Sequence, residues 1–275
     1  MSMQPAPRDG LAREIAAELA RLPEVLAVAL AGSRTSGNHD ARSDIDLYVY
    51  AREEVPVERR REIAERRGVR VEVDNRFWET GDEWDERDSG THVDVMFRSP
   101  AFAEDSLARV LDRHEASLGY STALWHNLRT SEVLFDRDGW MAGIKVSASR
   151  AYPDALAHAI ITKNWPLLRG VAGAYPKQIA LAAQREDLVA VNHRLAALLA
   201  SAFDVLFALN RVTHPGEKRL LALAARLPLA PADLRASVEA MLSFEAGSLE
   251  RVPAHVDAFV DSLEELLARE LHAHG

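Results

Sequence analysis

Apolar residues recur at every second position in several short stretches within the first hundred residues. Because successive side chains of a β-strand point to opposite faces, this spacing predicts strands with one apolar and one polar face. An uninterrupted apolar run precedes them and predicts a buried strand. These stretches lie at residues 25–30, 45–50, 69–74 and 91–98. The N-terminal part of the chain is therefore expected to form a β-sheet.

Carboxylates occupy the polar face of two of these predicted strands. Asp44 and Asp46 are two residues apart and lie on the opposite face from Ile45. In a later strand, Asp94 likewise points away from its flanking valines. Carboxylates that share one face repel each other unless a cation lies between them, and Mg²⁺ binds carboxylate oxygens while keeping positions open for phosphates. The pair at 44 and 46 therefore predicts a metal site.

Helices and loops account for the rest of the chain. Gly68 is expected to end a charged helix as a left-handed terminator. The acidic stretch 78–88 predicts a loop, in which Trp78 and Trp84 either pack the loop onto the domain or stack on a base. After residue 101 the pattern predicts helices alone. Helices are expected near residues 9–22, 53–67, 121–130, 139–148, 152–170, 177–185, 188–209, 216–226, 232–245 and 252–272, and a further helix with Leu107, Val110, Leu111 and His114 on one face is expected to end at Gly119.

The change from mixed elements to helices alone sets the expected fold class and domains. We predict an α+β protein with an N-terminal mixed β-sheet flanked by helices and a C-terminal all-α domain. Gly119 is expected to mark the boundary, which gives domains at residues 1–119 and 120–275.

Composition narrows the possible partners. The 275 residues carry a net charge of −9, which argues against duplex nucleic acid because such binding needs many cations against the phosphates. The absence of cysteine excludes disulfides and thiolate ligands. Residues 195–209 are interrupted by Asp204 and too short for a bilayer, and the N-terminus lacks a signal pattern, so we expect a cytoplasmic protein without a membrane partner. The oligomeric state stays open.

A Gly-Ser pair precedes the two carboxylates by ten residues. Gly32 lets the backbone approach a triphosphate, and Ser33 can donate a hydrogen bond to its oxygens. The spacing from Gly32-Ser33 to Asp44-x-Asp46 thus predicts a combined phosphate and metal site.

This arrangement resembles the nucleotidyltransferase superfamily, whose best-known member is DNA polymerase beta, and its aminoglycoside and lincosamide nucleotidyltransferases. The resemblance implies that Asp44, Asp46 and Asp94 bind two Mg²⁺ ions and that Asp94 takes the proton of the acceptor. It also implies ATP as the substrate. Glu72 and Asp74 lie on the polar face of another predicted strand and compete with Asp94 for the third position.

Cationic side chains could complete the nucleotide site. Arg34 and Arg42 flank the motif and either offset the triphosphate charge or lie exposed on a loop. Residues 210–218 and 134–140 resemble an uncharacterised family that joins this catalytic domain to a helical domain. That resemblance implies that Lys218 touches the triphosphate or the acceptor. Alternatively, a lysine is an exposed surface residue without a role in binding, and we favour this interpretation for Lys145 and Lys177.

These observations lead to one main hypothesis with two alternatives. The main hypothesis is a Mg²⁺-dependent nucleotidyltransferase that moves a nucleoside monophosphate, AMP from ATP, to a hydroxyl of a small-molecule acceptor and releases pyrophosphate. One alternative is nucleotidylation of a protein or an RNA, as in minimal nucleotidyltransferases of toxin and antitoxin systems. The other is a nucleotide-binding module without turnover. The sequence does not identify the acceptor.

Overall fold

The computed structural model describes residues 7–31, 44–245 and 247–273. The chain divides into two compact units. The sheet unit comprises Met1–Leu107 and Asn127–Arg150, and the helical unit comprises Ala108–His126 and Ala151–Gly275. The chain therefore passes from one unit to the other three times. These units are defined by contacts between residues, whereas the boundary predicted at Gly119 separates domains that fold independently. That boundary stays a prediction.

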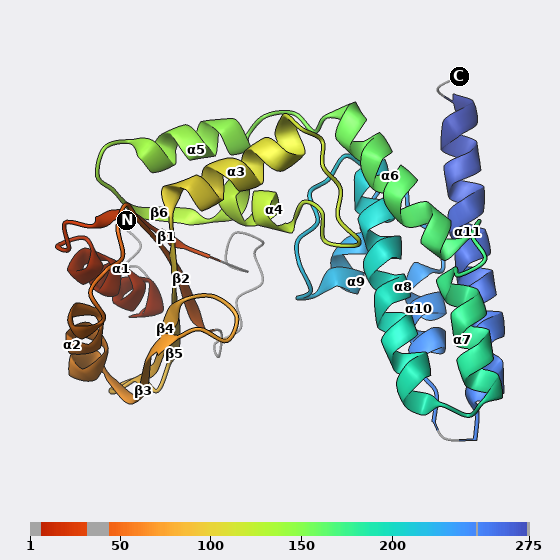
Figure 1. Ribbon diagram of the computed structural model, residues 1–275, viewed down its shortest axis with the longest axis horizontal. Coiled ribbons are helices and arrows are strands. Elements are labelled where there is room, and N and C mark those ends of the chain that lie inside the picture. The colour runs from red at the N-terminus through yellow and green to blue at the C-terminus, as the bar shows by residue number, and fades with distance from the viewer. Residues whose placement is uncertain (1–6, 32–43, 246, 274–275) are drawn as a thin grey trace, which may run out of the picture. The chain divides into compact units, whose positions relative to one another are not determined.

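The strands of the described chain form one mixed sheet in the order β3-β4-β5-β2-β1-β6. Neighbouring strands run antiparallel, except β2 and β5, which are parallel. Figure 1 shows the sheet edge-on among its helices. The strands are β1 (Val25–Leu30), β2 (Ile45–Ala51), β3 (Gly68–Asn75), β4 (Gly81–Glu86), β5 (His92–Arg98) and β6 (Glu132–Asp136).

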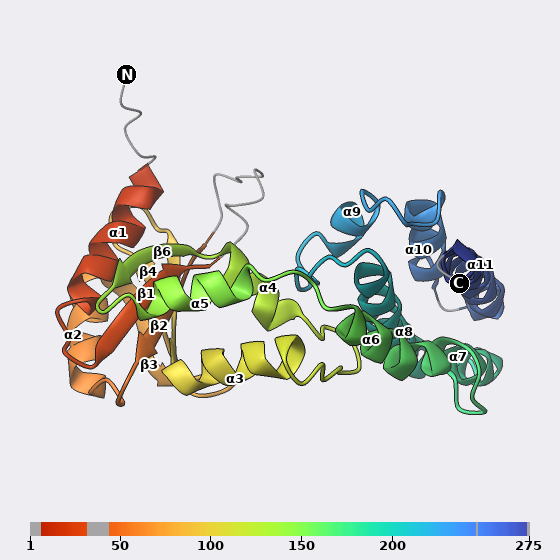
Figure 2. The ribbon, with the colours of Figure 1, turned by 90° about the horizontal axis from the view of Figure 1, so that it is seen from above.

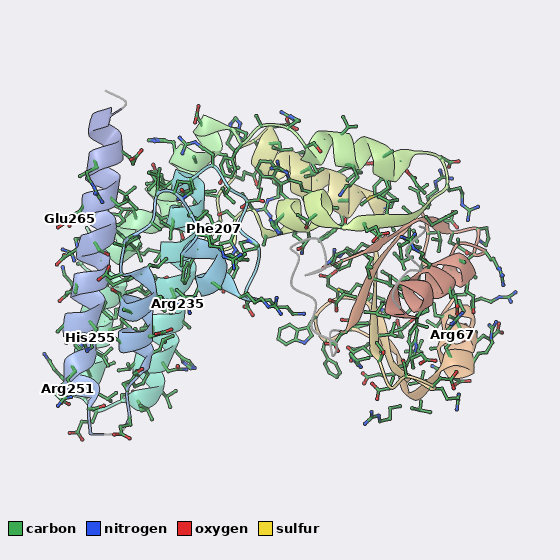
Figure 3. All side chains as sticks on the ribbon, turned by 180° about the vertical axis from the view of Figure 1, so that it is seen from behind. Arg67, Phe207, Arg235, Arg251, His255 and Glu265 are labelled. Atoms are coloured by element: carbon green, nitrogen blue, oxygen red, sulfur yellow. The ribbon has the colours of Figure 1, made fainter. Side chains whose placement is uncertain are left out.

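Helices cover both faces of this sheet. On one face α1 (Pro7–Leu19) and α2 (Val57–Arg67) pack on the alternating apolar residues of the strands, with Ile15 and Ile63 in the shared core (Figure 2). Arg67 on α2 joins the two helices through a hydrogen bond of 2.6 Å to Glu18 on α1 (Figure 3).

The second face lies under α3 (Pro100–Leu111) and α5 (Trp140–Ala148). Tyr50 of β2 contacts Trp140 of α5 with ring centres 5.2 Å apart. The guanidinium of Arg98 lies 4.0 Å from the ring centre of Tyr48 and 5.3 Å from that of Phe102 on α3. Arg98 therefore lies buried between this face of the sheet and α3.

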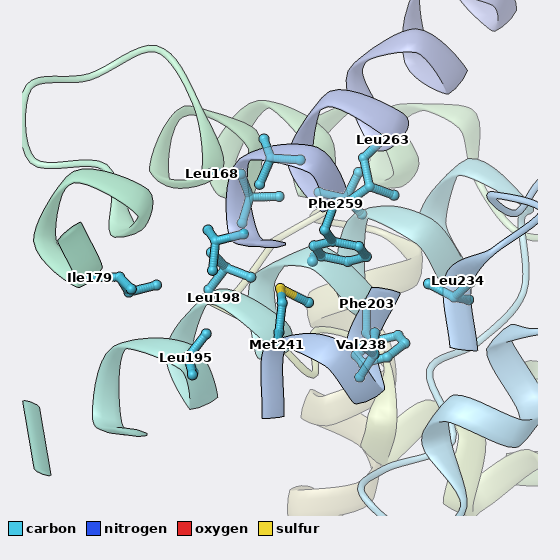
Figure 4. Packing of buried hydrophobic residues seen from close by; sticks show 14 of the residues in the cluster. Leu168, Ile179, Leu195, Leu198, Phe203, Leu234, Val238, Met241, Phe259 and Leu263 are labelled. Carbon is cyan, nitrogen blue, oxygen red and sulfur yellow. The ribbon is translucent and has the colours of Figure 1, made fainter. Parts of the chain in front are cut away.

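The helical unit packs around one central helix, α8 (Leu188–Leu209). Its buried side chains meet those of the surrounding helices in a single apolar core (Figure 4). By length and composition α8 could cross a membrane, and no other helix in the described ranges could. The other elements are α4 (Ala123–Thr130), which leads from this unit to the sheet unit, α6 (Asp154–Leu168), α7 (Tyr175–Gln184), α9 (Leu220–Ala224), α10 (Leu234–Leu242), the 3₁₀ turn η2 (Leu249–Arg251) and α11 (Val252–Ala273).

The predicted α+β class is confirmed, whereas three local predictions are wrong. Strand β6 was expected to be helix or loop, and β4 occupies most of the predicted acidic loop. Gly68 is extended, with φ −120° and ψ 172°, and begins β3 instead of ending α2 in a left-handed conformation. A Cβ at this position would lie 2.5 Å from Cδ1 of Trp84, so close packing of the indole requires the glycine. Trp84 is buried, but Trp78 is 96% exposed.

Candidate active site

Asp46 and Asp94 occupy paired positions on the two parallel strands at the centre of the sheet. Asp46 of β2 is in register with Asp94 of β5. Residues in register on neighbouring strands point their side chains to the same face, with backbones about 4.8 Å apart. The sheet therefore places these two carboxylates side by side, although 47 intervening positions separate them in the chain.

Two glutamates extend this pair into a row across the sheet. Glu83 of β4 lies opposite Asp94, and Glu72 of β3 lies opposite Glu83. The pKa of Asp94 is raised to about 6, chiefly by burial and then by the negative charges of Glu83 and Asp46. We call Asp46, Asp94, Glu83 and Glu72 the carboxylate row. Its repulsion is an electrostatic cost that a bound cation would offset.

A histidine stands beside this row. His92 precedes Asp94 by two residues and shares its face, and its Nδ1 lies 3.0 Å from Oδ1 of Asp85. Its Nε2 lies 3.9 Å from a carboxylate oxygen of Glu83. The hydrogen bond from His92 lowers the pKa of Asp85, which also pairs with Arg70. The electrostatic surroundings of the row thus include both signs of charge.

The predicted phosphate-binding residues lie mostly outside the described chain. Gly32, Ser33, Arg34 and Arg42 all fall within residues 32–43, which the structure does not describe. On the near side of that segment, Ala31 donates its N–H to the carbonyl of Asp46 over 2.8 Å. The chain therefore enters the Gly-Ser pair directly beside the carboxylate row.

The remaining predicted residues have different positions. Asp44 is exposed and immediately precedes β2. Asp74, one of the competing carboxylates, is hydrogen-bonded by Arg76 at 3.1 Å and does not face Asp46. Glu72 lies on β3, two strands further from β2 than Asp94. Of the three candidates, only Asp94 is in register with Asp46.

Lys218 belongs to the other unit. It is exposed and lies in the turn between α8 and α9 of the helical unit.

The donor set suits a hard divalent cation. The paired carboxylates offer the oxygen ligands that Mg²⁺ prefers, and their mutual repulsion favours a cation between them. Among the described residues, no three histidine, aspartate or glutamate side chains are already gathered closely enough to hold a metal. Asp46 and Asp94 therefore fit the metal as a pair, with the other positions left to water and phosphate oxygens.

Sequence reasoning missed the partners of Asp94. Glu83 and Asp85 alternate with the buried Trp84, which is the period of a strand, but the density of charge in this stretch suggested a loop. His92 carries the same signal, since it lies two residues before Asp94 and hence on the same face.

Comparison with known proteins agrees with the geometry of the sheet unit. Residues 13–83 match the family model described as polymerase beta, nucleotidyltransferase. Residues 13–83 are thus similar to a nucleotidyltransferase domain, which confirms the resemblance seen in the sequence and supports nucleotidyl transfer as the general activity. Asp44 and Asp46 lie inside the match, and Asp94 lies beyond it.

A later part of the chain matches another family model. Residues 121–220 match a domain of unknown function, DUF4037, so this match includes β6 and α5 of the sheet unit as well as much of the helical unit. No curated protein matches the chain in sequence. A crystal structure of a nucleotidyltransferase-like protein from Exiguobacterium sibiricum is similar, with 14% identity, a TM-score of 0.45, and coverage of 96% of this chain and 75% of that chain.

Proposed function

We propose that the protein is a Mg²⁺-dependent nucleotidyltransferase that transfers AMP from ATP to a hydroxyl of a small-molecule acceptor. The observation that carries this proposal is the register of Asp46 and Asp94 on adjacent parallel strands, in a domain of the nucleotidyltransferase type. This arrangement brings together two carboxylates from distant parts of the chain at the point where the Gly-Ser segment begins.

Asp44, Asp46 and Asp94 would hold the metal. When bound, Mg²⁺ neutralises phosphate charge and stabilises the oxygens that attack and leave during an in-line displacement. Glu83 and Glu72 lie further along the row and are not assigned to the metal. Their role in the proposal is to keep the local potential negative.

The transfer exchanges one phosphorus–oxygen bond for another. The hydroxyl oxygen of the acceptor bonds to the α-phosphorus of ATP, the bond from that phosphorus to the bridging oxygen breaks, and pyrophosphate leaves. Asp94 takes the proton that the hydroxyl loses. Gly32 and Ser33 hold the triphosphate, and Arg34 and Arg42 offset its charge. A contact of Lys218 with the nucleotide stays a prediction.

Charge supports a small acceptor. The chain has a net charge of −9, and the surface beside the metal-binding pair bears the carboxylate row. A nucleic acid acceptor would have to approach this negative surface with its own phosphates, which is unfavourable. The cytoplasmic location stays a prediction.

Pyrophosphate release in the presence of ATP, Mg²⁺ and a panel of hydroxylated small molecules tests the proposal. We expect Asp46→Asn and Asp94→Asn each to lower the rate at least about a hundredfold, the scale for losing one group that stabilises the transition state. Glu72→Gln is the matched control, since it removes one charge from the same row without touching the metal pair, and it should keep most of the activity.

Other outcomes would redirect the assignment. If Asp46→Asn retains full activity, the metal assignment is wrong. Transfer of label to a protein or an RNA instead of a small molecule would favour the corresponding acceptor class. Nucleotide binding without turnover on any acceptor of the three classes would favour a binding module.

A further inference from the structure

The loop between β3 and β4, residues 76–80, carries two exposed aromatic side chains that the proposed transfer does not use (Figure 1). Phe77 is 83% exposed and Trp78 is 96% exposed. We call these two neighbouring residues the aromatic pair. Large aromatic side chains left in water are unfavourable, and they are enriched where proteins bind other molecules. The sequence left open whether Trp78 packs or stacks, and its exposure shows that it does not pack on the described chain.

Hydrogen bonds hold the backbone on the N-terminal side of the aromatic pair. Asn75, the last residue of β3, accepts from the N–H of Phe77 at 3.0 Å with its side-chain oxygen. Its side-chain nitrogen donates to Glu83 of β4 at 3.2 Å. One asparagine therefore fixes the start of the loop to a member of the carboxylate row.

An ion pair holds the other side of the aromatic pair. Glu79 follows Trp78 directly and accepts two hydrogen bonds from the guanidinium of Arg98 on β5, at 2.6 and 2.8 Å. Such a bidentate pair fixes the geometry as well as neutralising the charge. The aromatic pair is thus presented by a loop that is fastened at both ends, so binding a ligand would cost little ordering of this loop.

The loop ends beside the carboxylate of Asp94. A Cβ at Gly81, the first residue of β4, would lie 3.9 Å from Oδ1 of Asp94 and 3.9 Å from the carbonyl oxygen of Glu79. The carboxylate and the loop backbone therefore border the same small space, which the glycine leaves open. The charge of Glu79 also contributes to the raised pKa of Asp94. A small molecule that presents a hydroxyl to Asp94 therefore has the loop 76–80 as its neighbour.

The charges around the loop favour a ring without phosphates. The guanidinium of Arg76 is paired with Asp74 at 3.1 Å, and that of Arg98 with Glu79 at 2.6 Å. Glu83 adds a further carboxylate from the row. Because both arginines are already neutralised, a triphosphate placed here would meet negative charge. An uncharged ring, in contrast, can stack on an aromatic face without any charged partner.

We propose that the aromatic pair binds the acceptor, and that the acceptor is a hydroxylated molecule with an aromatic ring. The ring stacks on Trp78 and contacts Phe77, while the hydroxyl meets Asp94. This inference rests on the proposed function, in which Asp94 takes the proton of that hydroxyl, and it deepens that function by naming the class of acceptor. Every residue that it uses belongs to the sheet unit.

Binding of a ring to the full-length protein without nucleotide tests the aromatic pair directly. The probe is naphthylethanol, and butanol is its counterpart without a ring. In isotope-labelled protein the indole N–H signals report on the individual tryptophans, and the signal of Trp78 is the one missing from Trp78→Phe. We expect naphthylethanol to shift the signal of Trp78 and to leave that of the buried Trp84 in place, whereas butanol should shift neither.

Substitutions separate stacking from general apolar attraction. Trp78→Leu and Phe77→Leu keep an apolar side chain but remove an aromatic face, so each should weaken the binding of naphthylethanol about tenfold, the scale for losing one stacked ring. Trp78→Phe keeps a face and should lose little. Val146→Ala is the control, since Val146 is 75% exposed on α5 of the same unit, and it should bind like the wild type. Unchanged affinity in Trp78→Leu would overturn the inference.

Adenosine distinguishes the acceptor from the nucleotide as the source of the ring, because it carries a base without phosphates. We expect it to shift the Trp78 signal less than naphthylethanol does. A stronger shift with adenosine, or a raised KM for ATP in Trp78→Leu, would assign the aromatic pair to the nucleobase and overturn the acceptor role. A change of oligomeric state in Trp78→Leu, with no shift from either ring, would assign it to an interface between copies of the chain instead.

Turnover separates this inference from the proposed function. With ATP and Mg²⁺, naphthylethanol should be a better acceptor than butanol, and Trp78→Leu should raise its KM about tenfold while the KM for ATP stays unchanged. If both alcohols are used equally well and Trp78→Leu alters neither, nucleotidyl transfer stands and this inference fails. If naphthylethanol shifts the Trp78 signal but no acceptor is turned over, the proposed function fails, and the aromatic pair keeps a ring-binding site without the acceptor role.

Discussion

Asp204 is a carboxylate in the middle of the most apolar helix. The pH dependence of the free energy of unfolding reports on its environment. Burial raises its pKa to about 6, against 3.8 in an unfolded chain, although Ser121 hydrogen-bonds to it. The folded state therefore binds a proton more tightly than the unfolded state. Its stabilising contribution is complete below about pH 3.8 and is lost as the pH rises through 6.

We expect Asp204→Asn to be more stable than the wild type at pH 7.5. The expected difference is about 2–3 kcal/mol, because the pKa of Asp204 is raised by about two units and each pKa unit corresponds to about 1.4 kcal/mol. Thermal unfolding at pH 4 and pH 7.5 measures it, and the two proteins should converge at the lower pH. Equal stability at both values would show that the carboxylate is hydrated in the folded protein.

His214 gives the opposite dependence in the same unit. Its pKa is lowered to about 4, against 6.5 when unfolded, so its stabilising contribution is complete above 6.5 and is lost as the pH falls through 4. In the wild type the contributions of Asp204 and His214 to the pH dependence of stability have opposite signs and partly cancel between pH 4 and 6. Asp204→Asn should therefore become visibly sensitive to acid over this range.

Single residues differ in how much the sequence reveals about them. Asp44 and Asp46 could be proposed from the sequence because a two-residue spacing is enough to predict one shared face. The neighbour relation of Asp46 and Asp94 depends on which strands pair, and no local pattern states that β2 and β5 are parallel neighbours. Asp204 was visible as a lone charge in an apolar run, but its partner Ser121 was not.

At the scale of elements, a lysine from one helix caps the C-terminal end of another. Lys145 of α5 donates from Nζ to the carbonyls of Leu128, Arg129 and Ser131, at 3.2, 2.6 and 2.8 Å, where α4 ends. These carbonyls have no partner in the helix, so the lysine satisfies them. The sequence suggested an ordinary surface lysine, because a cation that caps a different helix leaves no local pattern.

We expect Lys145→Met to lower the free energy of unfolding by about 1–3 kcal/mol, because carbonyls at the end of α4 lose a charged donor. Lys177→Met is the matched control, since Lys177 is exposed on α7 and should change stability by less than about 0.5 kcal/mol. Chemical denaturation of the two variants gives the comparison. Similar losses in both would mean that Lys145 does not cap α4.

Strands β4 and β6 show why element prediction failed where it did. Strand β4 contains four carboxylates among six residues, yet Asp82 is buried in a hydrogen-bonded pair with Arg60 at 3.0 Å. Strand β6 offers only a short apolar run and depends on pairing with β1. Both strands are stabilised by contacts with residues distant in the sequence, which a local pattern cannot show. By contrast, β1 and α8 have long apolar runs that predict a buried strand and a buried helix without reference to the rest of the chain.

At the scale of the whole molecule, the two units are interleaved along the chain. The sequence contains a single change of pattern, at which a boundary near Gly119 was predicted. The chain returns to the sheet unit at Asn127–Arg150, and that return brings the strand beside β1 and the helix that contacts Tyr50. The spacing of apolar residues predicts strands and helices, but it does not show that the chain returns to a unit that it has already left.

A fragment of residues 1–119 should therefore fail to fold as a stable sheet unit. It lacks β6 and α5, which leaves one side of the buried strand β1 unpaired. We expect it to be insoluble or to unfold without a cooperative transition, in contrast to the full chain, as measured by circular dichroism during heating. A soluble fragment with a cooperative transition would support the predicted boundary instead.

The late return of β6 also bears on synthesis. Strand β1 is complete at residue 30, but its partner β6 begins only at residue 132. At about 5–20 residues per second, the ribosome needs on the order of ten seconds to supply it. During that interval one edge of β1 in the nascent chain has no native partner, so the sheet unit cannot complete its fold until residues 127–150 have been made, and a holding chaperone would be most useful there.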